Sequence, residues 1–129
     1  MKKKVKATIA VLSTMMVLVM SAFCVSASAF SRTVRLYNTG AAGGSHNSES
    51  YTIGNYRSYS ATLGSLEAGA TKHTITISNS NGTIAVFELK TTNTTGAYSA
   101  GSPTGSSTKA YHSLTTRNSG ASNATLNAD

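Results

Sequence analysis

Residues 73–90 read HTITISNSNGTIAVFELK, two strand-like runs joined by a turn. In the first run, Ile75 and Ile77 alternate with threonines, which is the two-residue period of a strand that is buried on one face. Asn81 and Gly82 follow, and both tolerate the positive φ that a tight hairpin turn requires. The stretch therefore predicts an antiparallel β-hairpin.

The second run of this hairpin, TIAVFELK at 83–90, is apolar on both faces. Such a strand is typical of a position that is covered on both sides, so we expect it to lie centrally in its sheet. A two- or four-residue loop would pair the isoleucines with Ile84 and Val86, whereas a three-residue loop with a glycine bulge would pair them with Ala85 and Phe87. The sequence leaves both registers open.

The chain beyond residue 29 shows further short alternating runs between turn-forming residues, and no sustained helical period. It contains only 14 Val, Ile, Leu and Phe residues, so its core is thin and is best shared by two sheets. We therefore predict an all-β fold, a small antiparallel β-sandwich or open barrel of about six strands. The predicted strands span residues 33–38, 50–53, 56–63, 71–79, 83–91 and 108–118.

The first 29 residues have the features of a bacterial secretory signal peptide: four lysines, an apolar stretch and then small residues. Small side chains at Ala27 and Ala29 predict cleavage before Phe30, with cleavage after Ala27 as the alternative. No basic stop-transfer cluster follows, so we expect no stable membrane anchor after cleavage. The bulky residue before Cys24 disfavours lipid attachment at that cysteine. We expect the protein to be secreted, or associated with the cell surface.

We therefore expect three parts: a leader at 1–29 that cleavage removes, a single β domain at 30–118 and a flexible polar tail at 119–129. The one cysteine leaves with the leader, so no disulfide or thiolate metal site is expected. Four lysines also leave, and the net charge falls from +7 to +3. The remaining basic residues are dispersed rather than clustered, which argues against nucleic acid as a partner.

Two segments resemble one another: HTITISNS begins at His73 and HSLTTRNS begins at His112. The interpretation that we favour is two strands, each opening on a histidine and closing on an Asn/Ser turn. A duplicated ligand site, with the two histidines on neighbouring strands, is the alternative, and chance similarity is a third. Only His46 and Glu49 have tight ligand spacing, and they lie in a Gly/Ser loop, so we predict no metal.

Catalytic patterns are missing from the sequence. Glycoside hydrolysis takes two facing carboxylates and a serine triad takes an orienting acid, but only Glu49, Glu67, Glu88 and Asp129 are acidic. No serine lies in a nucleophile-elbow motif. We therefore predict neither an enzyme nor a cofactor.

Six tyrosines offer a different chemistry, because each combines a flat apolar face with a polar tip and suits sugar rings and protein surfaces alike. Together with nearby basic and histidine side chains they define the candidate binding residues. These are Tyr56, Arg57, Tyr59, His73, Tyr111 and His112.

These features predict a secreted, non-enzymatic binding module that acts outside the cell, with a cell-surface glycan, a wall polymer or a protein as its partner. The first alternative is an antimicrobial polypeptide. HTITISNSNG and HSLTTRNSG resemble the His-led strand and Asn/Gly-rich turn of the cysteine-free, lactococcin-type bacteriocins, although that family's tryptophans are absent here. The second alternative is a self-assembling matrix subunit that adds strands edge to edge. The oligomeric state stays open.

Overall fold

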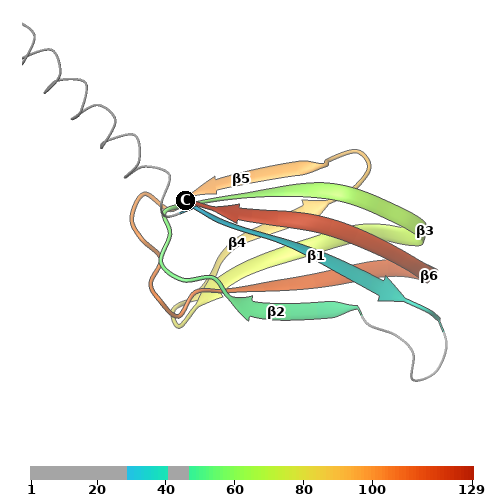
Figure 1. Ribbon diagram of the computed structural model, residues 1–129, viewed down its shortest axis with the longest axis horizontal. Coiled ribbons are helices and arrows are strands. Elements are labelled where there is room, and N and C mark those ends of the chain that lie inside the picture. The colour runs from blue at the N-terminus through green and yellow to red at the C-terminus, as the bar shows by residue number, and fades with distance from the viewer. Residues whose placement is uncertain (1–28, 41–46) are drawn as a thin grey trace, which may run out of the picture.

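Six strands form one antiparallel sheet that does not close on itself, as seen in the computed structural model (Figure 1). The model describes residues 29–40 and 47–129, and that part of the chain contains no helix. The all-β prediction and the number of strands are therefore confirmed. The strands are β1 (Phe30–Asn38), β2 (Ser48–Thr52), β3 (Ser58–Asn79), β4 (Gly82–Leu89), β5 (Thr95–Ser99) and β6 (Lys109–Ala128).

The two longest strands, β3 and β6, pair with each other along their whole length and bend together in the middle. Residues 58–68 of β3 and 120–128 of β6 join β1 and β5 in one layer, which we call the β1/β5 layer. Residues 70–79 of β3 and 109–116 of β6 join β2 and β4 in the other, the β2/β4 layer. The folded sheet is thus a sandwich whose layers are continuous through two strands (Figure 1).

Small residues make the bend possible. Ala68 has a positive φ of 54°, and a Cβ added to Gly69 would lie 2.6 Å from the backbone oxygen of Ser119. On the other strand, a Cβ added to Gly120 would lie 2.5 Å from the backbone nitrogen of Ala70. Any larger residue at either glycine would push the two backbones apart, so the close crossing of β3 and β6 depends on these glycines.

The hairpin at residues 73–90 adopts the second of the two predicted registers. Ile75 lies opposite Phe87 and Ile77 opposite Ala85, while Asn79 lies opposite Gly82 across a two-residue loop. A bulge next to Ile77 reconciles the short loop with this register, because it leaves one extra residue on β4.

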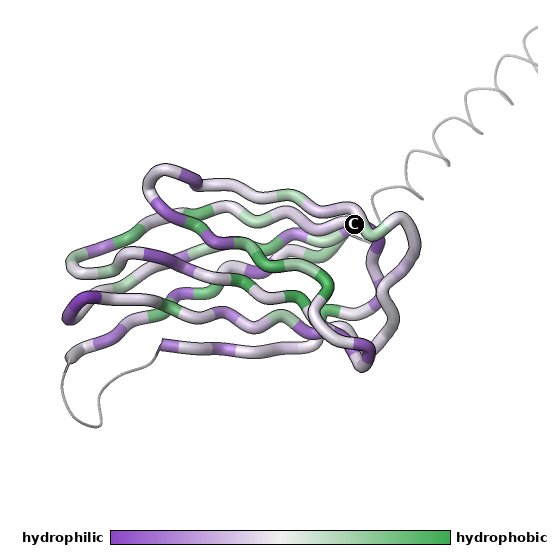
Figure 2. Tube along the Cα trace, turned by 180° about the vertical axis from the view of Figure 1, so that it is seen from behind, coloured by the Kyte–Doolittle hydropathy of each residue, from purple (hydrophilic) through white to green (hydrophobic). Residues whose placement is uncertain are grey.

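The expectation that this second run lies centrally is wrong, because β4 is an edge strand. Ala85, Phe87 and Leu89 face the interior, but Val86 points outward and is 53% exposed. Figure 2 shows a hydrophobic stretch along β4, which runs across the middle of this view. The apolar outer face of β4 is therefore exposed to solvent and is not buried against another part of the sheet.

The predicted flexible tail is also wrong, because residues 119–128 belong to β6. Every second residue there, from Gly120 to Ala128, is buried, and most have small side chains that suit a thin interior. Two predicted strands, 56–63 and 71–79, merge into β3, and β5 lies between the predicted strands 83–91 and 108–118, where no strand was expected. Residues 1–28 and His46 lie outside the described residues, so the leader and its cleavage stay predictions.

Residues 29–40 and 47–129 include no helix long and apolar enough to cross a membrane.

Candidate functional site

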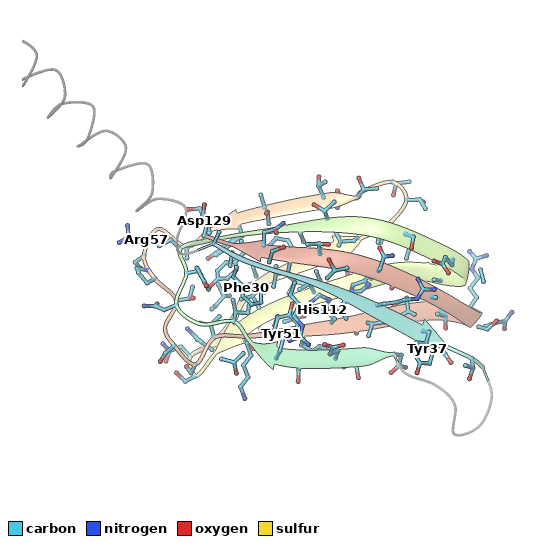
Figure 3. The ribbon with its side chains drawn as sticks, viewed as in Figure 1. Phe30, Tyr37, Tyr51, Arg57, His112 and Asp129 are labelled. Carbon is cyan, nitrogen blue, oxygen red and sulfur yellow. The ribbon has the colours of Figure 1, made fainter. Side chains whose placement is uncertain are left out.

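Four polar side chains form a continuous chain of hydrogen bonds through the interior. The Oγ atom of Ser122 lies 2.7 Å from Nδ1 of His73, and Nε2 of His73 lies 2.9 Å from Nδ1 of His112. Nε2 of His112 lies 2.8 Å from the hydroxyl of Tyr51. We call these four residues the histidine chain. Figure 3 shows its outer end, with Tyr51 and His112 lying together beside β2.

Strand register explains how the histidine chain forms. His112 lies opposite Ile75 and His73 lies opposite Leu114, so the two imidazoles are diagonal neighbours on the inner face of the β2/β4 layer. Ser122 belongs to the β1/β5 layer, and its bond to His73 therefore joins the layers. The hypothesis of a duplicated site placed the histidines on neighbouring strands, and they do lie there. Both are fully buried, however, so neither is accessible to an external ligand.

Burial also fixes the protonation of the histidine chain. It lowers the pKa of His73 to about 4. Burial, the nearby His73 and the positive charge of Arg32 together lower the pKa of His112 to about 3. Burial raises the pKa of Tyr51 to about 12, against the opposing effect of Arg32. At neutral pH the histidine chain therefore carries no charge, and each imidazole has one N–H to donate.

The outer end of the histidine chain closes one open side of the sandwich. The guanidinium of Arg32 on β1 lies 4.2 Å from the ring centroid of Tyr51 and pairs with Glu49 on β2. Phe30 stacks on the same tyrosine, with ring centroids 6.0 Å apart. These contacts link β1 to β2, which share no backbone ladder.

The other predicted binding residues do not form one surface. Tyr59 is buried and its hydroxyl contacts Thr104. Tyr56 is half-buried and packs on Phe30. Arg57 is exposed at the strand ends of the β1/β5 layer, where its backbone bonds to Asp129 (Figure 3). Burial thus removes Tyr59, and likewise the two histidines, from the predicted contact surface.

Tyr111 remains accessible, 46% exposed on the outer face of the β2/β4 layer. Strand register aligns it with Ser50 on one side and Thr76 on the other, and Val86 lies beyond Thr76 on β4. We call this row of four residues, with the adjacent exposed Lys109, the Tyr111 face. Sequence reasoning selected Tyr111 but missed Val86, because only the pairing of β3 with β4 places the two on one face.

Two surface grooves hold no catalytic arrangement. One, of about 560 Å³, lies at the end of the β1/β5 layer, and Asp129 is the only carboxylate that lines it among the described residues. The other, of about 230 Å³, lies between β4 and β5, and Glu88 is likewise its only described carboxylate. Over residues 29–40 and 47–129, no three His, Cys, Asp or Glu side chains gather where they could hold a metal ion.

No protein-family model matches the chain, and no curated protein matches it in sequence. Among solved structures, the nucleoplasmin-like N-terminal domain of Drosophila FKBP39 covers 81% of this chain and 93% of its own, at 8% identity and a TM-score of 0.37. The Drosophila NLP core, solved for insight into pentamer formation and histone binding, covers 77% and 98%, at 14% identity and a TM-score of 0.36.

A virus-like particle of the extra small virus of the prawn Macrobrachium rosenbergii covers 77% of this chain and 79% of its own, at 11% identity and a TM-score of 0.25. All these likenesses are distant. The function proposed below is therefore derived from the residues of this chain alone.

Proposed function

We propose that the protein is a secreted, non-enzymatic β-sandwich module that binds a partner outside the cell through the Tyr111 face. The partner is a cell-surface glycan, a wall polymer or a protein. Secretion is supported by the leader, whose lysines, apolar stretch and small residues before Phe30 have the pattern of a signal peptide.

The observation that carries this proposal is the pair of large apolar side chains left exposed in one row on the outer face of the β2/β4 layer. Tyr111 and Val86 are 46% and 53% exposed, and they lie on either side of Thr76. Two strand spacings separate them, about 10 Å, which leaves room for one extended polymer or a flat patch of a partner. Serine, threonine and lysine neighbours supply hydrogen bonds around them. Aromatic residues surrounded by polar groups are typical of binding hot spots.

The sheet itself explains why this face is rigid enough to bind. Tyr111 lies on β6 and Thr76 on β3, the two strands that pair along their full length. The opposite face of these two strands carries the fully buried Ile75 and Ile77 and the histidine chain. The core therefore fixes the backbone beneath the Tyr111 face. A rigid platform lowers the ordering cost of association.

Co-sedimentation of the purified protein with intact bacteria and with isolated cell walls tests the proposal. Loss of a central aromatic anchor typically costs more than 1.4 kcal/mol, so Tyr111→Ser should weaken binding at least about tenfold. Tyr37→Ser is the matched control, because Tyr37 is equally exposed, 46%, but lies on the outer face of the β1/β5 layer. Equal loss of binding in both variants, or no loss in either, would overturn the assignment of the Tyr111 face.

Counting surviving cells in the same tubes tests the first alternative, because killing of bound strains would favour an antimicrobial polypeptide. Light scattering without cells tests the second. Assembly that grows with protein concentration and is abolished by Val86→Lys would favour a matrix subunit built through the β4 edge.

A further inference from the structure

The interior of the sandwich contains one fully buried side-chain hydrogen bond that joins its layers, between His73 and Ser122. Hydrogen bonding continues from His73 through His112 to Tyr51. A displacement of Ser122 or of Tyr51 therefore affects every hydrogen bond of the histidine chain.

The fully buried side chains around the histidine chain are mainly apolar. Side-chain hydrogen bonds from Asn38 to Thr116 and from Arg32 to Glu49 also connect the layers, but they lie nearer the surface.

We propose that the histidine chain is an acid-operated latch: it holds the two layers in register while both imidazoles are neutral, and releases them when the pair takes up protons.

Proton counting across the three hydrogen bonds supports this latch. With both imidazoles neutral, the N–H of each can donate to the next group along the chain, and every bond from Ser122 to Tyr51 is satisfied. One added proton can still be held, because a single imidazolium donates from both nitrogens. A second proton would set N–H against N–H where His73 and His112 are 2.9 Å apart, so this bond must break.

The surroundings offer the added protons no counter-charge. In the described part of the chain, β3, β4, β5 and β6 turn only uncharged side chains toward the pair. The titratable groups that face it are Tyr51 and Glu49 from β2, and Arg32 from β1. Glu49 lies opposite His112 in the register, but its carboxylate is already paired with Arg32. A proton on either histidine is therefore buried without a free anion, which is strongly unfavourable.

The fold determines which part of the molecule moves when the histidine pair takes up protons. The layers are continuous through β3 and β6, so they stay joined at the bend near Gly69 and Gly120. The protonated pair can be hydrated only where the layers part, so the added charge drives the layers to separate about this bend. Release therefore opens the side where β1 meets β2 rather than dissociating the molecule.

The first test is equilibrium unfolding of the purified protein between pH 7.5 and 5, above the range in which exposed carboxylates titrate. Each buried histidine should raise the unfolding constant by up to about tenfold per pH unit in the acid half of this range. His73→Gln and His112→Gln should each flatten the dependence, whereas Arg57→Gln, a control at an exposed position, should leave it unchanged. A dependence that is equal in all three variants would overturn the proposal.

The second measurement separates release of the layers from global unfolding and needs no histidine variant. Nitroxide labels at Ser31→Cys and Thr115→Cys, in a Cys24→Ser background, report the distance between the outer faces of the two layers. We expect a single distance at pH 7.5 and a longer, broader distribution in acid while circular dichroism still reports β structure. A distance that stays constant until the β signal disappears would overturn the latch.

Discussion

Around Ile77 the interior is closed by apolar side chains, whereas around His73 and His112 it is closed by a chain of hydrogen bonds. Both regions lie on the inner face of the same two strands and are equally buried. Apolar packing gives stability that does not depend on direction or pH, while the histidine chain gives directional contact that requires neutral imidazoles. The comparison shows that one thin core combines a stabilising region with a pH-dependent one.

The largest effect is expected in the apolar region. Ile77→Ala removes a side chain with no exposed surface and should lower the free energy of unfolding by about 2–5 kcal/mol, because the cavity cannot fully collapse. Urea denaturation measures this change. Val86→Ala is the control and should stay within about 0.5 kcal/mol, because Val86 is exposed. Similar losses in both variants would contradict the division of β3 and β4 into inner and outer faces.

The second-largest effect on stability is expected from acid, which should destabilise the region around the histidines but not the apolar region. The histidine pKa is about 6.5 in the unfolded chain and about 4 for His73 in the folded protein, so the unfolded state binds more protons between these values. Stability is therefore highest above pH 6.5 and falls as the pH drops toward 4, by about 3 kcal/mol for His73 alone.

Ile77→Ala should shift this pH profile downward without changing its slope, whereas His112→Gln should reduce the slope. Urea midpoints collected across the pH range provide both profiles. If Ile77→Ala also flattened the profile, the two regions would not be independent.

A smaller effect is expected from the bond that joins the layers. Ser122→Ala leaves one nitrogen of His73 buried without a partner, which should lower the free energy of unfolding by about 1–3 kcal/mol at pH 7.5. Thermal unfolding followed by circular dichroism measures the loss. Ser31→Ala, an exposed serine on the outer face of the same layer, should change stability very little.

The smallest effect is expected at the outer end of the histidine chain. Arg32→Gln removes a positive charge that helps to hold the pKa of His112 low, so this pKa should rise toward its ordinary value. Nitrogen chemical shifts of the imidazole, followed by NMR against pH, report the change. Arg35→Gln is the control, because Arg35 pairs with Glu67 on the outer face. A fall in the His112 pKa would contradict the placement of Arg32 beside the chain.

Several features were predictable from local sequence patterns. The alternation of isoleucine and threonine before Asn81 and Gly82 identified the hairpin, and Tyr111, which was selected for its amphipathic ring, is exposed in the structure. The pattern failed for the last ten residues, because alanine, serine and asparagine have little strand preference of their own. Those residues form a strand because β1 and β3 pair with β6 on both sides.

The histidine chain was not predictable in the same way. Its members lie 39, 49 and 61 residues apart along the sequence, and no motif connects Tyr51 or Ser122 with the histidines. Likewise, the length of the hairpin loop did not reveal that a bulge beside Ile77 would turn Val86 outward. One extra residue on a strand exchanges its inner and outer faces, so a small local event changed which side chains reach the surface.

By itself, the sequence determined that the chain forms strands and where its tightest turn lies, because these properties depend on each residue and its immediate neighbours. Only the tertiary structure decided that β4 lies at an edge, that β3 and β6 bend into two layers, and that two histidines share a buried hydrogen bond. These outcomes depend on register between distant strands, where the free energy is shared among many weak long-range contacts and no single segment encodes it.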